Sequence, residues 1–198
     1  MNKKLFITLE ILIYITFMTL DILKIDFHQD YLKYLGVVLC LVYASLEAKN
    51  IFLVTLIADY FLLIRDDHYI TGVIIFIVVQ VLYFFYLRKL NIKNYYPLRM
   101  ILCLIGLIAV SFIMPSPLNY LTIVYFSQLL CSSIEVTLNK KHNLLALGLC
   151  LFVCCDICVG LHNLLPYSHL VSLGQWFFYL PSQVLIALSS NGDFYNLL

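Results

Sequence analysis

The sequence predicts an all-α protein: a single bundle of eight transmembrane helices that occupies residues 1–198. Three observations support this fold class. The chain is 63% apolar and only 12% charged, with a mean hydropathy of +0.97, so it has more apolar surface than a water-soluble domain of this length buries. It divides into apolar windows close to the length of about 20 residues that a bilayer requires. The segments between these windows are too short to fold independently.

The windows are apolar runs bounded by charged residues, prolines or asparagines. Lys3 and Lys4 precede the first run as in a signal peptide, but Glu10 interrupts it and no A-x-A cleavage site follows, so we interpret it as a retained span. The third window is short, and we expect it to be extended or tilted. The eight windows are Leu5–Leu23, Tyr31–Ala48, Ile51–Ile64, Tyr69–Leu87, Leu98–Met114, Leu118–Leu138, Asn143–Leu165 and Leu170–Ser189.

The joints between windows predict the orientation of the chain in the membrane. Pro115-Ser116-Pro117 predicts a tight hairpin, and residues 90–97 form the longest joint. Joints on the N-terminal side contain nine of the 12 Lys and Arg residues. The positive-inside rule therefore places both termini in the cytoplasm. Because we find no secretory or organelle address, we expect a bacterial inner membrane.

Composition and motifs exclude several classes of function. A net charge of +1 without a basic tail excludes a nucleic-acid partner. The seven cysteines lie mostly inside apolar runs, so we interpret them as packing residues. The five histidines lack H-x-x-x-H spacing, and we find no G-x-S-x-G elbow and no Gly-rich phosphate loop. We therefore expect no metal site and no cofactor, and the oligomeric state stays open.

Polar residues recur inside the apolar windows at helical spacing. An ionisable group at membrane depth costs on the order of 3 kcal/mol, so such groups usually face a cavity or a partner. The fifth window has no such stripe, and we expect it to face lipid. The stripes in chain order are Glu10, Tyr14 and Asp21; Lys33, Gly36, Cys40, Tyr43 and Glu47; Thr55 and Asp59; Gly72, Gln80 and Tyr83; Tyr125, Gln128, Ser132 and Glu135; Asp156, Gly160 and Asn163; and Gln175, Tyr179 and Gln183.

Asp59 and Asp156 lie deepest in apolar sequence, and we predict that they are catalytic. Stripes that converge enclose a polar chamber. Two carboxyl groups in such a chamber are the arrangement for a proton donor and a water-activating base at neutral pH. The alternative is that each aspartate only hydrogen-bonds neighbouring helices and holds the bundle together.

Six further polar residues are candidates for binding a substrate. Lys33 either neutralises an aspartate or receives a phosphate, or it extends its ammonium outward to the membrane surface. The tyrosines either orient a polar headgroup or fill space with their hydroxyls satisfied nearby. The six candidates are Lys33, Gln80, Tyr83, Tyr125, Tyr179 and Gln183.

Three segments are similar to patterns of one protein family. Residues 56–63 (LIADYFLL), followed by Gly72, Phe76, Gln80 and Tyr83, resemble S-x-x-G-D-x-x-L … G-x-x-x-F-x-x-x-H-x-x-Y. Residues 148–160, which contain Leu-Phe-Val-Cys-Cys-Asp, resemble G-A-x-L-F-x-x-S-D, and residues 179–189 (YLPSQVLIALS) resemble Y-x-x-x-Q-x-L-I-x-x-S. These are patterns of the lysoplasmalogenase (YhhN-like) family of eight-span membrane proteins. The likeness extends through most of the chain from about Tyr31.

The resemblance implies hydrolysis of the vinyl ether bond of lysoplasmalogens to a fatty aldehyde and a glycerophospho-headgroup. Asp59 and Asp156 match the family's two aspartates, with the order of acid and base left open. Protonation of a vinyl ether carbon gives an oxocarbenium ion, as in glycosidases, and likewise needs a carboxylic acid and a carboxylate. The chain departs from the patterns at Ala58, Gln80 and Cys155, which replace Gly, His and Ser. Glutamine keeps the hydrogen bonding of histidine but does not titrate.

The resemblance also implies the partners, which are a lysophospholipid substrate and membrane lipids. Two other functions stay open. A divergent member of the family would bind lipid without turnover. A small proton-coupled transporter would also place Asp, Lys and Tyr inside the membrane, although the sequence has no broken helices at matching places in two halves.

Overall fold

The computed structural model describes residues 1–25, 29–65, 68–164 and 169–192. Within these ranges the chain is all-α, as predicted, and each of the eight apolar windows overlaps a helix. The elements in chain order are α1 (Lys3–Leu23), α2 (Gln29–Tyr43), α3 (Leu46–Asp59), the π-helical segment η1 (Tyr60–Ile64), α4 (Tyr69–Lys89), α5 (Tyr96–Ile113), α6 (Pro117–Asn139), α7 (Asn143–Leu164) and α8 (His169–Ser190).

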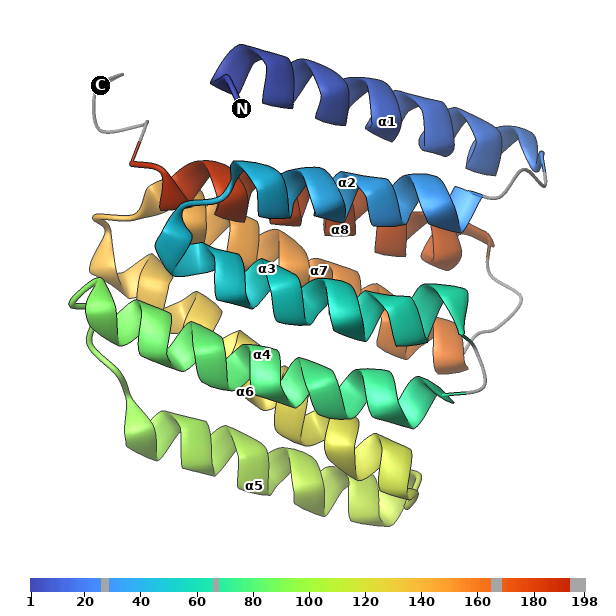
Figure 1. Ribbon diagram of the computed structural model, residues 1–198. Helices are drawn as coiled ribbons and strands as arrows, with labels where there is room; N and C mark the ends of the chain where they lie inside the picture. The colour runs from blue at the N-terminus through green and yellow to red at the C-terminus, as the bar shows by residue number, and fades with distance from the viewer. Residues whose placement is uncertain (26–28, 66–67, 165–168, 193–198) are drawn as a thin grey trace.

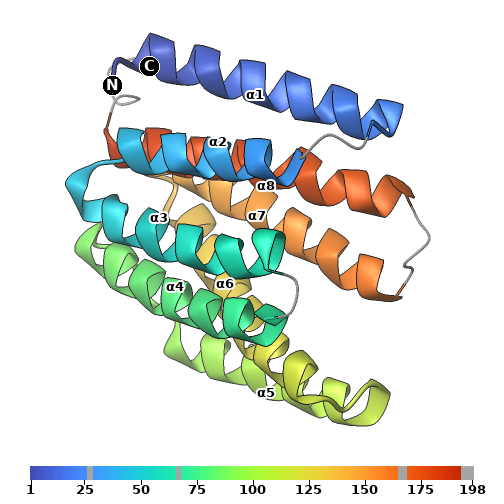
Figure 2. The same ribbon diagram turned by 45° about the vertical axis from the view of Figure 1, so that its right-hand side comes forward.

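The helices run alongside one another in two layers (Figures 1 and 2). One layer consists of α2, α3 and α4, and the other of α8, α7 and α6, each packed in that order. The layers meet where α2 contacts α8 and where α4 contacts α6. At one edge α1 packs on α2 and α8, and at the opposite edge α5 packs on α6. The start of α1 and the end of α8 lie at the same end of the bundle (Figure 1).

In the described part of the chain, six helices, namely α1, α4, α5, α6, α7 and α8, are long and apolar enough to cross a membrane by length and composition. They indicate an integral membrane protein. Two of the eight predicted spans fall short by themselves, because α2 has 15 residues and α3 has 14, against the 20 or so that a bilayer needs. The short third window, Ile51–Ile64, is extended at its start, because α3 begins at Leu46, and η1 carries the helix to Ile64, where the window was predicted to end.

The boundary between α2 and α3 corrects one prediction. The sequence predicts a second span over Tyr31–Ala48, but α2 ends at Tyr43. Tertiary contacts explain why the helix ends there, because side chains at the end of α8 bind backbone groups at the break between α2 and α3. Asn191 Nδ2 donates to the Tyr43 carbonyl at 2.8 Å, and the Ser45 N–H donates to Ser190 Oγ at 3.0 Å. These bonds satisfy polar groups that a continuous helix satisfies internally.

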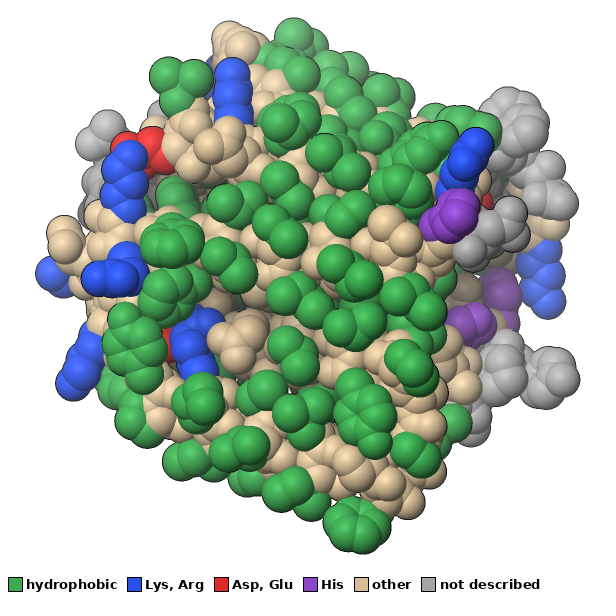
Figure 3. Space-filling view, turned by 60° about the horizontal axis from the view of Figure 1, so that its bottom comes forward, with side chains coloured by type: hydrophobic (Ala, Val, Ile, Leu, Met, Phe, Trp, Pro, Cys, Tyr) green, Lys and Arg blue, Asp and Glu red, His purple; other side chains and the backbone are tan. Residues whose placement is uncertain are grey.

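The outer surface is apolar between two ends that carry most of the charges. Figure 3 shows hydrophobic side chains across the middle of the face over α5, with Lys and Arg side chains gathered toward its ends. On α5, Phe112 and Ile113 are 86% and 73% exposed, as suits side chains in lipid. Glu47 lies in the first turn of α3, where it pairs with Lys89 at 2.6 Å. This position corrects the prediction that Glu47 belongs to the inner stripe of the second window.

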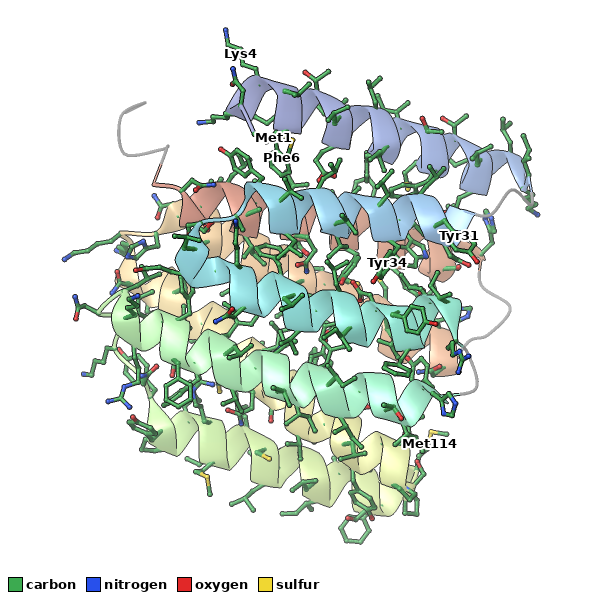
Figure 4. The ribbon with its side chains drawn as sticks, viewed as in Figure 1. Met1, Lys4, Phe6, Tyr31, Tyr34 and Met114 are labelled. Atoms are coloured by element: carbon green, nitrogen blue, oxygen red, sulfur yellow. The ribbon has the colours of Figure 1, made fainter. Side chains whose placement is uncertain are left out.

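A proline inside α8 creates the attachment point for α1. Pro181 has no N–H, so the Phe177 carbonyl four residues earlier has no donor within the helix. The Tyr14 hydroxyl of α1 donates to that carbonyl at 3.3 Å. Phe6, which points from α1 toward α2 (Figure 4), stacks on Tyr43 with 4.1 Å between ring centroids. These contacts dock α1 by one face, and its other side chains are largely exposed.

Candidate active site

The first candidate carboxyl group lies where α3 passes into η1. Asp59 is 3% exposed and follows Thr55 and Leu56 on the buried face of the helix. The Tyr179 hydroxyl of α8 donates to Asp59 Oδ2 at 2.6 Å, and Tyr179 is itself buried. The two residues are 120 positions apart in the chain, so the packing of the two layers creates the pair.

The second candidate carboxyl group is built in the same way. Asp156 on α7 accepts a hydrogen bond at Oδ2 from the hydroxyl of Tyr125 on α6, the helix packed beside it. Tyr125 is buried, and Asp156 is partly buried. Each predicted catalytic aspartate therefore has a tyrosine from a neighbouring helix on one oxygen. The sequence predicts these tyrosines as substrate contacts, whereas here they bind the aspartates.

Aromatic rings connect the two pairs across the bundle. The centroid of Tyr125 lies 5.5 Å from that of Phe76 on α4, Phe76 lies 6.2 Å from Phe152 on α7, and Phe152 lies 5.7 Å from Tyr179. A series of packed aromatic rings in the interior of the bundle therefore joins the two aspartate–tyrosine pairs.

Lys33 lies beside this site and is only 5% exposed. Its Nζ atom is 3.6 Å from Asp21 Oδ2 and 3.4 Å from Asp30 Oδ1, and it lies 4.2 Å from the centroid of Trp176. The Trp176 ring in turn lies 5.8 Å from the ring of Tyr179. Lys33 is therefore a buried cation at the end of the bundle where α1 ends and α2 begins, and one of its partners, Asp30, is 54% exposed. The acids that it pairs with are not the two candidate catalytic residues.

The other predicted binding residues are buried, but they do not contact either aspartate by a hydrogen bond. Gln80 is 2% exposed, and Tyr83 and Gln183 are both 0% exposed. Gln183 Nε2 donates to Ser182 Oγ at 3.4 Å. Among the described residues, both polar atoms of Gln80, the Tyr83 hydroxyl and Gln183 Oε1 have no hydrogen-bond partner.

A separate cluster corrects the prediction for α5 and for the inner stripe of α6. The fifth window is predicted to lack interior polar groups, but Arg99 on α5 is 5% exposed. Its guanidinium donates to Gln128 Oε1 at 3.0 Å, to Ser132 Oγ at 3.1 Å and to both carboxylate oxygens of Glu135. Gln128, Ser132 and Glu135, the other residues of the predicted inner stripe of α6, therefore bind Arg99 of α5. The rest of α5 is largely exposed, in agreement with the prediction that it faces lipid.

Glu10 forms a third polar position, between α1 and α2. It is 2% exposed, and the Cys40 thiol lies 3.5 Å from its Oε1 as a donor. Glu10 Oε2 has no partner among the described residues. This acid does not pair with either candidate catalytic residue.

Sequence reasoning missed the surroundings of Lys33. Asp30 lies three residues before Lys33 on the same helix, so helical spacing predicts this neighbour, whereas Asp21 and Trp176 come from other helices and have no local signal. In the described part of the chain, no group of three or more His, Cys, Asp and Glu side chains is suited to hold a metal ion.

The model of the YhhN family matches residues 29–190, a segment that contains every predicted site residue and leaves α1 outside. No curated protein and no solved structure matches the chain.

Proposed function

Because this chain belongs to the YhhN family, we propose that it is a membrane-embedded hydrolase that cleaves the vinyl ether bond of lysoplasmalogens. The products are a fatty aldehyde and a glycerophospho-headgroup. The observation that carries the proposal is the pair of interior carboxyl groups, Asp59 and Asp156, each bound on one oxygen by a tyrosine. Two such groups joined by an aromatic wall suit an acid-catalysed addition of water to a lipid chain.

The reaction needs one carboxylic acid and one carboxylate. The acid gives its proton to the vinyl carbon farther from the ether oxygen, and the C=C electron pair forms the new C–H bond. The carbon beside the oxygen becomes an oxocarbenium ion. Water adds to this carbon and gives a proton to the carboxylate, which leaves a hemiacetal. The hemiacetal loses its hydroxyl proton, its C–O bond to glycerol breaks, and the glycerol oxygen takes up a proton. One water molecule is consumed for each bond cleaved.

Tyr125 and Tyr179 are positioning residues in this scheme. Each phenol occupies one oxygen of its aspartate and fixes the orientation of the carboxyl group, so that the other oxygen faces the substrate. Either aspartate fits either role. The Phe76 and Phe152 rings between the pairs suit the alkenyl chain, because lipid-binding sites are mostly apolar with a few oriented polar groups.

Lys33 is the proposed contact for the phosphate of the headgroup. Its ammonium lies next to the Trp176 ring, one aromatic contact away from the tyrosine that binds Asp59. Its two ion-pair distances, 3.4 and 3.6 Å, are longer than the 2.7–2.9 Å typical of charge-assisted hydrogen bonds. A phosphate is therefore able to replace one carboxylate partner.

We further propose that all eight helices cross the bilayer, with both termini in the cytoplasm of a bacterial cell. The arrangement of α2 and of α3 with η1 supports this, because both lie alongside the six long helices (Figure 1). The excess of Lys and Arg on the N-terminal side supports the orientation. Single cysteines placed in successive joints of a cysteine-free protein, labelled from outside in intact cells, test it. Labelling of joints that precede and follow α2 from the same side contradicts eight spans.

The test of the enzymatic proposal is aldehyde release by the purified protein in detergent. Wild type, Asp59→Asn and Asp156→Asn are incubated with lysoplasmalogens and with ester lysophospholipids, and folding is checked by thermal melts. Glu47→Gln is the matched control, because Glu47 lies at the exposed end of α3 and pairs with Lys89. We expect aldehyde from wild type and control only.

Other results separate the remaining functions. A folded wild type that releases no aldehyde from any vinyl ether lysolipid contradicts the hydrolase and leaves a lipid-binding protein. If lysolipid crosses sealed vesicles that contain the protein, without being consumed and with a proton current, the protein is a transporter. For a lipid-binding protein we expect the aspartate variants to change stability, and for a transporter we expect them to change transport. In neither case is there a reaction for them to affect.

A further inference from the structure

A second polar layer lies one helical turn from the two aspartates, toward the α2–α3 turn. On α3, Thr55 comes four residues before the aspartate, and on α8, Gln183 comes four residues after the tyrosine that binds it. The two helices run in opposite directions, so both steps lead to the same end of the bundle (Figures 1 and 2). On α4, Gln80 follows Phe76 by the same four residues, and Tyr83 continues on this buried face.

Five polar atoms of this layer have no hydrogen-bond partner among the described residues: Thr55 Oγ1, Gln80 Nε2 and Oε1, the Tyr83 hydroxyl and Gln183 Oε1. The four side chains are at most 2% exposed. Buried polar atoms in native proteins are nearly always paired, either with protein or with ordered water. Unpaired atoms on α3 and on two helices that contact it, α4 and α8, therefore indicate a site that holds ordered water or a polar ligand group.

The chemistry of these atoms defines the ligand. All five belong to neutral side chains, and they include a pure donor, two pure acceptors and two hydroxyls that both donate and accept. The interior cations Lys33 and Arg99 are held elsewhere by carboxylates of their own, so the layer lacks the charge that a phosphate requires. A hydroxyl group fits, since it is uncharged and both donates and accepts.

We propose that Thr55, Gln80, Tyr83 and Gln183 form a hydroxyl-binding layer that takes either water or the free hydroxyl at glycerol C2 of the lysolipid. The proposal rests on the proposed function. The C2 hydroxyl is a few bonds from the vinyl ether, comparable with the rise of about 5.4 Å for one helical turn. A two-chain lipid carries an ester at C2 and has no hydroxyl to donate there, so the layer selects single-chain over two-chain lipids.

The first experiment measures the layer without turnover. Hydroxyl-radical footprinting with mass spectrometry, on substrate-free protein in nanodiscs, oxidises buried side chains that lie next to bound water. Tyr83 is the probe, and Tyr43, which is 7% exposed and stacked on Phe6, is the reference. We expect at least threefold more oxidation of Tyr83 than of Tyr43. Added lysoplasmenylethanolamine is expected to protect Tyr83 if its hydroxyl enters the layer.

The second experiment compares lysoplasmenylethanolamine with its 2-deoxy analogue. Wild type is expected to show a kcat/KM at least tenfold lower for the deoxy analogue. In Gln80→Leu and Gln183→Leu the two substrates are expected to differ by less than threefold. Ser127→Ala is the matched control, because the Ser127 hydroxyl is buried but donates to Val124 O of its own helix at 2.9 Å. This control is expected to keep the wild-type ratio.

The two readouts together identify the occupant. Discrimination against the deoxy analogue supports binding of the substrate hydroxyl, whereas strong oxidation of Tyr83 with equal rates for both substrates supports water as the occupant. The proposal is overturned if Tyr83 is oxidised no more than Tyr43 and the protein does not discriminate between the natural and the deoxy substrate. Footprinting does not depend on aldehyde release. If the protein shows no turnover, the proposed function is contradicted, but footprinting still tests the hydroxyl-binding layer.

Discussion

The buried ion pair between α5 and α6 makes a quantitative prediction about stability. Arg99 and Glu135 have side chains that are 6% and 0% exposed. Glu135 accepts hydrogen bonds from Arg99 Nε at 3.1 Å, from Arg99 Nη2 and from the backbone N–H of Tyr95 at 2.7 Å. Removal of this acid alone leaves a buried guanidinium without its counter-charge. We expect Glu135→Leu to lower the free energy of unfolding by about 3–5 kcal/mol.

The double variant Arg99→Met/Glu135→Leu is expected to be more stable than the single one. It removes both charges and replaces them with apolar side chains of similar size, which is often neutral or favourable for a buried pair. The polar atoms of Gln128 and Ser132 and the Tyr95 N–H then lose partners, at a cost of about 1–2 kcal/mol in total if water reaches them. The double variant should therefore recover roughly 2 kcal/mol relative to Glu135→Leu.

The assay is reversible unfolding by SDS in mixed micelles, followed by far-UV circular dichroism and by the fluorescence of Trp176, the only tryptophan. Trp176 lies in the separate Lys33 cluster, so its signal reports global unfolding and not the local change. A Glu135→Leu protein within 1 kcal/mol of wild type refutes the reasoning, as does a double variant no more stable than the single one.

Three further predictions concern the site and its scaffold. Tyr125→Phe and Tyr179→Phe each remove a hydrogen bond to a candidate catalytic aspartate. We expect aldehyde release to fall roughly tenfold and the free energy of unfolding in SDS titrations to fall by about 1–3 kcal/mol. Unchanged rates would contradict a positioning role. Gly148→Ala places a Cβ 2.8 Å from Ile186 Cγ1 and 3.2 Å from backbone atoms of α8, whereas Gly160 has nothing within 4 Å. The free energy of unfolding should fall by about 1–3 kcal/mol for Gly148→Ala and rise by up to about 1 kcal/mol for Gly160→Ala. Equal effects of the two substitutions would argue against a tight α7–α8 contact. Lys33→Met removes the cation next to Trp176; the wild-type preference for lysoplasmenylethanolamine over the phosphate-free alkenylglycerol should disappear in kcat/KM, and an unchanged ratio would show that Lys33 is structural.

Local sequence predicted the helices well because each is a nearly continuous apolar run with polar stops. Ser116 and the prolines beside it illustrate this: the Ser116 side chain accepts from the Asn119 N–H at 3.2 Å, and Pro117 occupies the first turn of α6. The prediction failed at the α2–α3 boundary, where Ser190 and Asn191 bind backbone groups. Those partners come from the far end of the chain, so no local pattern reports them.

Helical spacing also predicted which face of most helices is buried, but not which helix that face meets. Gln128 and Glu135 share a stripe with Tyr125, yet they bind Arg99 on α5, while Tyr125 binds the aspartate of α7. The direction of a stripe follows from the period of 3.6 residues. The identity of its partner depends on how neighbouring helices are ordered around the bundle, which periodicity does not encode.

The sequence by itself determined that the protein belongs in a membrane, where its helices lie, and which two acids must be kept away from lipid. Composition and helical periodicity are properties of the linear chain, so they can be read without the tertiary structure. Only the tertiary structure decided that Tyr179 meets Asp59, that Tyr125 meets Asp156 and that Lys33 pairs with Asp21. These contacts join residues of different helices, and their geometry follows from helix order and depth. A hydrogen bond or ion pair requires its two groups to lie within a few ångströms, and that proximity is a property of the packed bundle.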